Sequence, residues 1–342
     1  MGDFGLLQRL CDLRGISGRE ERVRKEILKE IPSDCSVSVD PLGSVIVEKK
    51  GRKRPACKLM ICAHMDEVGL IVTSVTGDGL LRFATVGGID EKVLAGIRVE
   101  VGDRAIPGVI VVKPIHLCEK DEAGKPVPMD SLLIDIGAAS KEEAEAAVRP
   151  GDEVTFAARF DAEGAVLRGK ALDDRAGCAL MLEMLRSEME YDTVFVFNVQ
   201  EEIGLRGSRA SSFTVAPDAA IVLESTTAGD LAGVPAEKCV CRMGGGAVVS
   251  FMDRATIYDK KFYGLAFRTA EECGAAVQPK LAVAGGNDAG AIHVSRGGVR
   301  TLAISLPCRY LHAPIGMIAK ADYESALRLT AALAEKIAGG VE

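Results

Sequence analysis

Four short apolar runs constrain the fold of this chain more than any other feature. They are residues 59–63, 193–199, 219–223 and 299–305, and none is longer than a strand. Runs of this length with no alternation of polar residues are typical of strands buried on both faces of a parallel sheet. Helical patterns lie between and after them, at residues 174–187, 257–273 and 322–337. We therefore expect an α/β fold with a central mixed, largely parallel sheet flanked by helices.

The stretch from about residue 72 to about residue 165 has a different pattern. Short Val, Ile and Leu segments alternate with glycine turns, at residues 80–86, 93–101, 106–112, 131–136 and 153–160, and only residues 141–148 favour a helix. This pattern predicts a small β-barrel-like domain inserted into the α/β fold. For 342 residues we expect a catalytic domain in two parts, 1–71 and 166–342, around an insert at 72–165.

Composition excludes several classes of partner. The net charge is −7, so neither nucleic acid nor an anionic membrane would be attracted over the whole surface. No apolar run reaches the roughly 18–20 residues of a membrane span, and the N-terminus lacks a signal-peptide pattern. Ten cysteines, several of them in apolar segments and none in a Cys-x-x-Cys pair, indicate buried thiols in a reducing compartment. We expect a cytoplasmic protein.

Polar residues follow the apolar runs. His64, the pair Glu201 and Glu202, and Glu224 stand at or just beyond the ends of three strands, and His312 follows a fourth. In open α/β sheets, ligands bind at the carboxyl ends of the strands. Each residue alone also has a structural explanation, as a capped loop histidine or a solvated loop acid.

Three neighbouring acids refine this pattern. Asp66 is two residues beyond His64 in an extended segment, so it can accept a hydrogen bond from the far ring nitrogen of that histidine. Asp173 and Asp174 precede a helix, where one can be a ligand and the other an N-cap. Glu201 and Glu202 allow one carboxylate to bind metal while the other serves as a general base.

Together these residues form a nitrogen and oxygen donor set without thiolate. Such a set suits Zn²⁺, Co²⁺ or Mn²⁺ and differs from a structural cysteine-type zinc site. Five ligands with one bridging carboxylate can hold two metal ions about 3.5 Å apart.

Five motifs carry a resemblance to a known family. The motifs are Ala63-His64-Met65-Asp66-Glu67-Val68-Gly69, Leu172-Asp173-Asp174-Arg175, Glu201-Glu202-Ile203-Gly204, Gly285-Gly286-Asn287-Asp288-Ala289 and Arg309-Tyr310-Leu311-His312-Ala313-Pro314. With these motifs in this order, the chain resembles the tetrahedral aminopeptidases over essentially its whole length. These are cytosolic dinuclear metallopeptidases that include glutamyl aminopeptidase-like members.

The resemblance implies a zinc-peptidase fold and a role for each site residue. His64, Asp173 and Glu224 would hold one metal, and Asp173, Glu202 and His312 the other, with Asp173 bridging. Two divalent ions are implied, Zn²⁺ first and Co²⁺ or Mn²⁺ as alternatives.

The implied reaction is removal of N-terminal residues from peptides through a metal-bridging water. Glu201 would be the general base, and Asp66 the partner of His64. The insert would be a dimerisation domain, with dimers assembling into a tetrahedral dodecamer. Two positions depart from the family's commonest pattern: Glu224 replaces a more usual Asp, and Asn287 a more usual Thr.

Several alternatives remain. A dinuclear deacylase acting on small N-acyl amino acids could use the same ligands, although such relatives usually carry an α/β sandwich insert. A glycosidase would leave the histidines unexplained, and adjacent glutamates rarely flank a sugar ring at roughly 5–9 Å. A non-catalytic metal-binding protein would have no need of Glu201.

Other polar residues favour structural roles. His116 lies in the insert without metal-type spacing, His293 falls in a predicted helix, and Asp288 is expected to cap that helix. Arg309 and Tyr310 could contact either substrate or nearby carboxylates. The glycines at 244–246 lack the Lys-Ser/Thr that follows a phosphate-binding loop.

Overall fold

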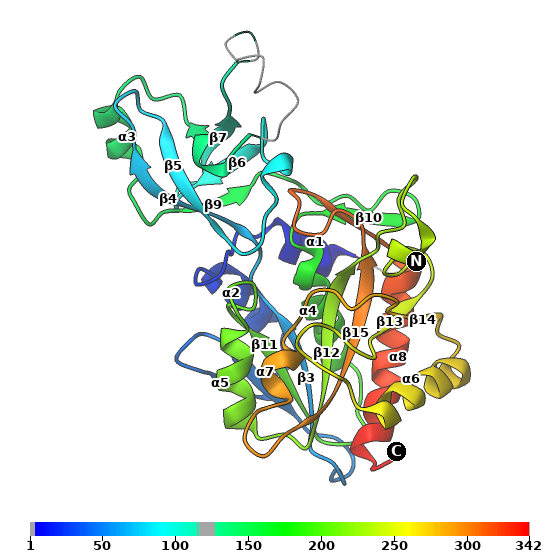
Figure 1. The fold of residues 1–342 in the computed structure, drawn as a ribbon. Helices are drawn as coiled ribbons and strands as arrows, with labels where there is room; N and C mark the ends of the chain where they lie inside the picture. Colours follow the sequence, from blue (N-terminus) through cyan, green and yellow to red (C-terminus); the bar gives the residue numbers. More distant parts are fainter. Residues whose placement is uncertain (1–3, 115, 117–126, 342) are drawn as a thin grey trace.

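The computed structural model describes residues 4–114, 116 and 127–341. Two parts are evident in Figure 1: an α/β body that contains both ends of the described chain, and a β-barrel that projects from one end of it. No helix in these described residues is long and apolar enough to cross a membrane.

The body is built on an eight-stranded mixed sheet, in the order β1-β2-β11-β3-β12-β15-β13-β14. Strands β11, β3, β12 and β15 run parallel at its centre, while β2 and β13 run antiparallel to their central neighbours. The predicted fold class is therefore confirmed. The strands are β1 (Ser36–Val39), β2 (Val45–Lys49), β3 (Leu59–His64), β11 (Thr193–Asn198), β12 (Ala219–Thr227), β13 (Ala247–Val249), β14 (Val277–Pro279) and β15 (Arg300–Cys308).

The central strands are buried along their whole length. Every residue of β3 and β11 is buried, including the large side chains of Phe195 and Phe197. This burial explains why these strands are apolar without alternation, because helices cover both of their faces.

Helices lie on both faces of the sheet. Helix α4 packs against β3 and β12 beside α1 and α8, whereas α5 and α7 contact each other and pack against β11, β12 and β15. Figure 1 shows α5 and α7 in front of the sheet and α4 behind it. The helices of the body are α1 (Gly5–Asp12), α2 (Glu21–Glu30), α4 (Leu172–Leu185), α5 (Arg206–Val215), α6 (Lys260–Cys273), α7 (Ala289–Ile292) and α8 (Lys320–Ala338).

The inserted segment forms a closed barrel in the order β4-β5-β8-β7-β6-β9. It has its own apolar core, which includes Leu70, Val99 and Ile134. The predicted barrel-like insert is thus confirmed. Its elements are β4 (Gly69–Val75), β5 (Leu81–Val86), η1 (Glu91–Val93), β6 (Arg98–Val101), β7 (Ile106–Val111), η3 (Met129–Ser131), β8 (Leu133–Asp135), α3 (Lys141–Ala147) and β9 (Glu153–Phe156).

The ends of the insert join the body through short connections. The expected boundary at about residue 72 falls inside β4, which begins five residues after His64. Beyond β9, strand β10 (Val166–Gly169) already pairs with β16 (Gly316–Ala319) of the body. The barrel therefore begins directly beside the segment that follows His64.

Two local expectations differ from the structure. Residues 93–97 are not part of a strand, because Asp90 accepts a hydrogen bond from the Lys92 amide and starts a 3-10 turn. The sequence Ser17-Gly18-Arg19-Glu20 is typical of a capping box, but no side chain caps α2. The Ser17 hydroxyl donates instead to Asp66, and Glu20 accepts from the Gly18 amide. Both side chains therefore form contacts that local sequence rules do not describe.

Candidate metal centre

The sheet brings together residues that are far apart in the chain. His64 is the last residue of β3, and Glu201 and Glu202 follow β11. Glu224 lies within β12 beside Ser305 of β15, so the strand runs four residues beyond the end expected from its apolar run. Because β3, β11, β12 and β15 are parallel, their carboxyl ends form one edge of the sheet. Asp173 reaches this edge from the start of α4, and His312 from the loop between β15 and β16.

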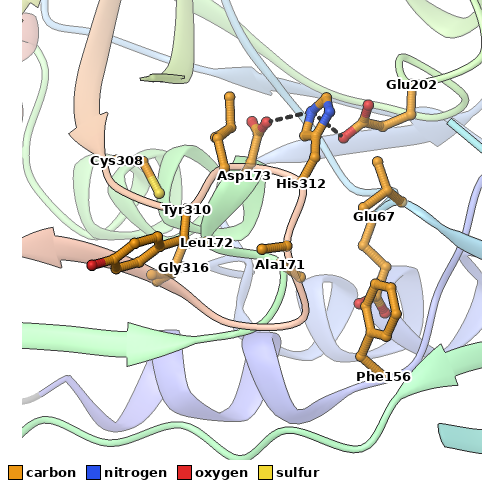
Figure 2. Close-up of a pocket in the computed structure, with 13 residues that line it drawn as sticks. Glu67, Phe156, Ala171, Leu172, Asp173, Glu202, Cys308, Tyr310, His312 and Gly316 are labelled. Atoms are coloured by element: carbon orange, nitrogen blue, oxygen red, sulfur yellow. Dashed lines mark ion pairs between the residues drawn. The ribbon is translucent and has the colours of Figure 1, made fainter. Parts of the chain in front are cut away.

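Asp173 lies between the two histidines. Its Oδ1 is 3.4 Å from Nε2 of His64, and its Oδ2 is 3.3 Å from Nε2 of His312. Glu224 Oε1 lies 3.4 Å from the same nitrogen of His64, and Glu202 Oε1 lies 3.3 Å from that of His312. Figure 2 shows His312 between Asp173 and Glu202, with both contacts drawn as dashed lines. The donors thus form two groups that share Asp173.

The donor atoms fit divalent metal ions. Nε2 of His64, Oδ1 of Asp173 and Oε1 of Glu202 are buried and have no hydrogen-bond partner among the described residues. Buried polar atoms without a partner cost free energy, so convergence of several such atoms favours a cation between them. The donor atoms fall into two clusters, and within each cluster they lie within 4.8 Å of one another. The first cluster is His64, Asp174 and Glu224, and the second is His64, Asp173 and Glu202. Imidazole nitrogens and carboxylate oxygens are a donor set that suits Zn²⁺, Co²⁺ or Mn²⁺.

The electrostatics of the centre also favour bound cations. Burial raises the pKa of Glu224 well above its ordinary value, and the nearby Asp173 raises it further. Burial opposes charge on His312, but Asp173 and Glu202 prevail and raise its pKa to about 11. Burial likewise raises the pKa of Glu201, an effect that His64 opposes and Asp288 reinforces. The raised pKa values of Glu224 and Glu201 show that negative charge is disfavoured on these buried carboxylates, and bound divalent ions would offset that charge.

The far nitrogens of the two histidines have different partners. Nδ1 of His64 lies 3.1 Å from the backbone oxygen of Asp66 and 3.5 Å from its carboxylate Oδ1. The nearer partner is therefore the backbone and not the carboxylate that the sequence pattern suggested. Nδ1 of His312 lies 2.8 Å from the backbone oxygen of Gly88, in the barrel. Both contacts leave Nε2 directed at the carboxylates.

The Asp66 carboxylate orients the loop that carries the paired glutamates. Its Oδ1 accepts from the Glu201 amide at 3.0 Å, and its Oδ2 accepts from the Glu202 amide at 3.1 Å. The Ser17 hydroxyl donates to the same Oδ2 at 2.6 Å. Asp66 is fully buried, so these hydrogen bonds fix the Glu201–Glu202 peptide relative to His64.

A buried network lies close to the centre and had no clear sequence signal. Asn198 donates to Asp288 Oδ2 at 2.7 Å and accepts from Ser211 at 2.8 Å. Asp288 precedes α7 but makes no side-chain cap there, so the expectation that it caps this helix is wrong. Asp174 is also buried, and its Oδ1 accepts from the Gly177 amide. Asp174 Oδ1 thereby acts as the cap, while the Asp174 carboxylate also belongs to the donor cluster with His64 and Glu224.

The remaining candidates have structural partners. His293 Nδ1 lies 2.8 Å from the backbone oxygen of Ala289, and Arg309 forms a two-point ion pair with Asp230. His116 belongs to neither metal cluster among the described residues. Asn287, at the second unusual position, hydrogen-bonds to the Tyr258 hydroxyl.

Comparison with known proteins agrees with this geometry. Residues 43–329 match the M42 glutamyl aminopeptidase family. A putative aminopeptidase of Acetivibrio thermocellus is 36% identical over 330 residues, which cover 95% of this chain and 96% of that protein.

Solved structures show the same fold. A TET aminopeptidase from Thaumarchaeota archaeon SCGC AB-539-E09 superimposes with a TM-score of 0.91 at 35% identity, covering 97% of this chain and 95% of the other. The TET1 peptidase of Pyrococcus horikoshii, described as able to assemble into a tetrahedron or a large octahedral shell, gives a TM-score of 0.84 at 34% identity, covering 96% and 98%. The chain is a peptide hydrolase that belongs to the M42 glutamyl aminopeptidase family.

Proposed function

We propose that this chain removes N-terminal residues from peptides with the help of two divalent metal ions. His64, Asp173 and Glu224 would hold one ion, and Asp173, Glu202 and His312 the other. The observation that carries the proposal is the position of Asp173, whose two oxygens face different histidines at 3.4 and 3.3 Å. The donor types favour Zn²⁺, with Co²⁺ and Mn²⁺ as alternatives.

Glu201 is the proposed general base. Bound divalent ions would lower the pKa of a water molecule and polarise the scissile carbonyl. Glu201 lies beside Glu202 but, among the described residues, makes none of the contacts with His64 or His312 that Asp173, Glu202 and Glu224 make, so its carboxylate is free to move protons. It would take a proton from the attacking water and deliver it to the departing amine. The raised pKa of Glu201, caused first by burial, suits a group that must both accept and release a proton.

Asp66 is proposed as a positioning residue. Its carboxylate holds the amides of Glu201 and Glu202, so the proposed base and its neighbouring ligand keep a fixed separation. The His64 ring is held through the backbone oxygen of the same residue. One residue would thus orient a ligand and the base together.

Self-association is the second part of the proposal. Dimers formed through the barrel and a tetrahedral dodecamer are proposed because the similar TET1 peptidase is described as a tetrahedral assembly. The cysteines that the structure describes are free thiols, which agrees with a reducing, cytoplasmic location. Sedimentation should give a species of about twelve times the mass of the single chain, and a single-chain species would contradict the assembly.

A substrate panel tests the reaction. The metal-free protein is reloaded with Zn²⁺, Co²⁺ or Mn²⁺ and assayed on free peptides, the same peptides with acetylated N-termini, and small N-acyl amino acids. Hydrolysis only of peptides with a free amine is expected. Preferential cleavage of N-acyl amino acids would instead identify a deacylase, although the closed barrel differs from the sandwich insert expected of that class.

A further inference from the structure

The loop that carries His312 has a strained backbone. Arg309 and Met317 close it through two backbone hydrogen bonds of 2.9 and 3.0 Å. Within the loop, Tyr310 and His312 have φ values of 61° and 59°, in the left-handed region that non-glycine residues rarely adopt. A backbone in this state needs contacts that hold it in place. The His312 side chain is one-third exposed, so packing alone holds it weakly.

A turn of the inserted barrel supplies such a contact. Gly87 and Gly88 directly follow β5, and the backbone oxygen of Gly88 lies 2.8 Å from Nδ1 of His312. Gly87 has a φ of 86°, and a Cβ added there would lie 3.3 Å from Cβ of Glu202 and 2.8 Å from Val68. The same turn therefore touches two of the three side chains in one proposed ligand group.

The chemistry of this contact fixes the state of the histidine. A carbonyl oxygen can only accept a hydrogen bond, so Nδ1 of His312 must carry the hydrogen. The lone pair of a neutral ring is then on Nε2, which faces Asp173 and Glu202 at 3.3 Å. His64 obtains the same arrangement from Asp66, which belongs to its own chain segment. The two histidines thus depend on carbonyl groups from different parts of the fold.

We propose that the barrel, through the turn at Gly87 and Gly88, positions His312 and sets the metal affinity of the group formed with Asp173 and Glu202. The group formed by His64, Asp173 and Glu224 is independent of this turn. A movement of the barrel relative to the body therefore changes the affinity for one ion and leaves the other unchanged. This inference rests on the ligand set of the proposed function.

Two glycine substitutions in the same barrel test the inference. In Gly87→Ala the added methyl group meets Val68 and Glu202, so the turn that carries the Gly88 carbonyl must shift. Gly96→Ala is the matched control, because Gly96 has a similar φ of 77° and no atom within 4 Å of its added Cβ. Calorimetric titration with Zn²⁺ against a competing chelator measures both ions in each metal-free protein.

The expected result is a selective loss. Gly96→Ala binds two ions per chain with the same two affinities as the wild type. Gly87→Ala binds one ion as the wild type does and the other about 10- to 100-fold more weakly. The loss should persist in a Glu224→Gln background and disappear in a Glu202→Gln background. Equal binding by both glycine variants, or equal weakening of both ions, overturns the inference. A wild type that binds no ions refutes the proposed function itself.

A measurement on the wild type keeps the inference testable if Gly87→Ala does not fold. Solid-state ¹⁵N spectra of the zinc-loaded protein with labelled histidine report which ring nitrogen carries hydrogen, and a His312→Gln variant assigns the signal. Hydrogen on Nδ1 with metal on Nε2 is expected. An unprotonated Nδ1 of His312 contradicts the hydrogen bond to Gly88 and with it the inference.

Discussion

At the scale of single residues, the proposed roles separate metal binding from proton transfer. Asp173 offers one oxygen to each histidine, while Glu202 and Glu224 each contact only one of them. Glu201 makes no such contact with either histidine in the described part of the chain. Loss of a proposed ligand carboxylate should therefore lower metal content, whereas loss of the Glu201 carboxylate should lower turnover alone.

Metal content should follow that division. Asp173→Asn should lower the content from two ions per chain to one or none, because both proposed groups lose their shared oxygen donor. Glu202→Gln and Glu224→Gln should each lose one ion and keep the other. The affinity for the ion that is kept should change by less than about tenfold. Elemental analysis after dialysis against a weak chelator measures this. Two tightly bound ions in Asp173→Asn would contradict the bridging role.

Sequence patterns predicted the polar residues near strand ends and Asp66 beside His64, but not the supporting contacts made by residues distant in the chain. His64, Glu202 and His312 stand next to apolar runs, so the parallel sheet alone brings them to one edge. The backbone oxygen of Gly88 leaves no such signal, because its partner is 224 positions away and the contact involves no side chain of the glycine. The hydrogen bond between Asn198 and Asp288 was missed for a similar reason, since it spans 90 positions.

At the scale of elements, loops at the sheet edge are held by ion pairs to neighbouring segments. Arg309 begins the loop that carries His312 and donates two hydrogen bonds, of 2.7 and 2.9 Å, to the carboxylate of Asp230. Asp230 in turn accepts from the Met243 amide, so the pair joins two loops to the end of β15. From the sequence, Arg309 could contact either substrate or a nearby carboxylate, and the structure pairs it with Asp230.

This ion pair predicts a pH-dependent contribution to stability. The hydrogen bonds from Arg309 lower the pKa of Asp230 below its ordinary value of 3.8. The contribution is therefore present above about pH 4 and is lost as the pH falls through the lowered pKa of the folded state. Asp230→Asn should lower the free energy of unfolding by about 1–2 kcal/mol at pH 7. The difference from wild type should shrink below pH 4.

Urea unfolding at several pH values measures this difference. Asp103→Asn is the control, because the Asp103 side chain is 89% exposed in its ion pair with Arg22 and should contribute little at any pH. A deficit in Asp230→Asn that is the same at pH 3 and pH 7 would refute the electrostatic explanation.

At the scale of the whole molecule, the candidate metal centre lies where the α/β body meets the barrel. Donors come from β3, β12, α4 and two loops of the body, and the barrel contributes the oxygen of Gly88. Figure 1 shows the barrel joined to the body at this end. Ion binding should therefore stabilise the body and its contact with the barrel together.

Removal of the ions should lower the thermal midpoint by several degrees. Each ion bound only by the folded chain stabilises it by about 2.7 kcal/mol when its concentration is 100 times the dissociation constant. Scanning calorimetry with and without chelator measures this change in midpoint. The change should be smaller in Asp173→Asn, which lacks the shared ligand. A wild-type midpoint that stays constant while elemental analysis reports loss of metal would contradict this coupling.

The most direct test of the proposed mechanism is the activity of Glu201→Gln measured on a preparation of known metal content. The proposed mechanism predicts two ions per chain, as in wild type, because it assigns no metal to Glu201. It also predicts a kcat lower by about 10²- to 10⁴-fold with little change in KM, because only proton transfer is removed. Two bound ions together with near-wild-type turnover would contradict the role of Glu201 and the mechanism built on it.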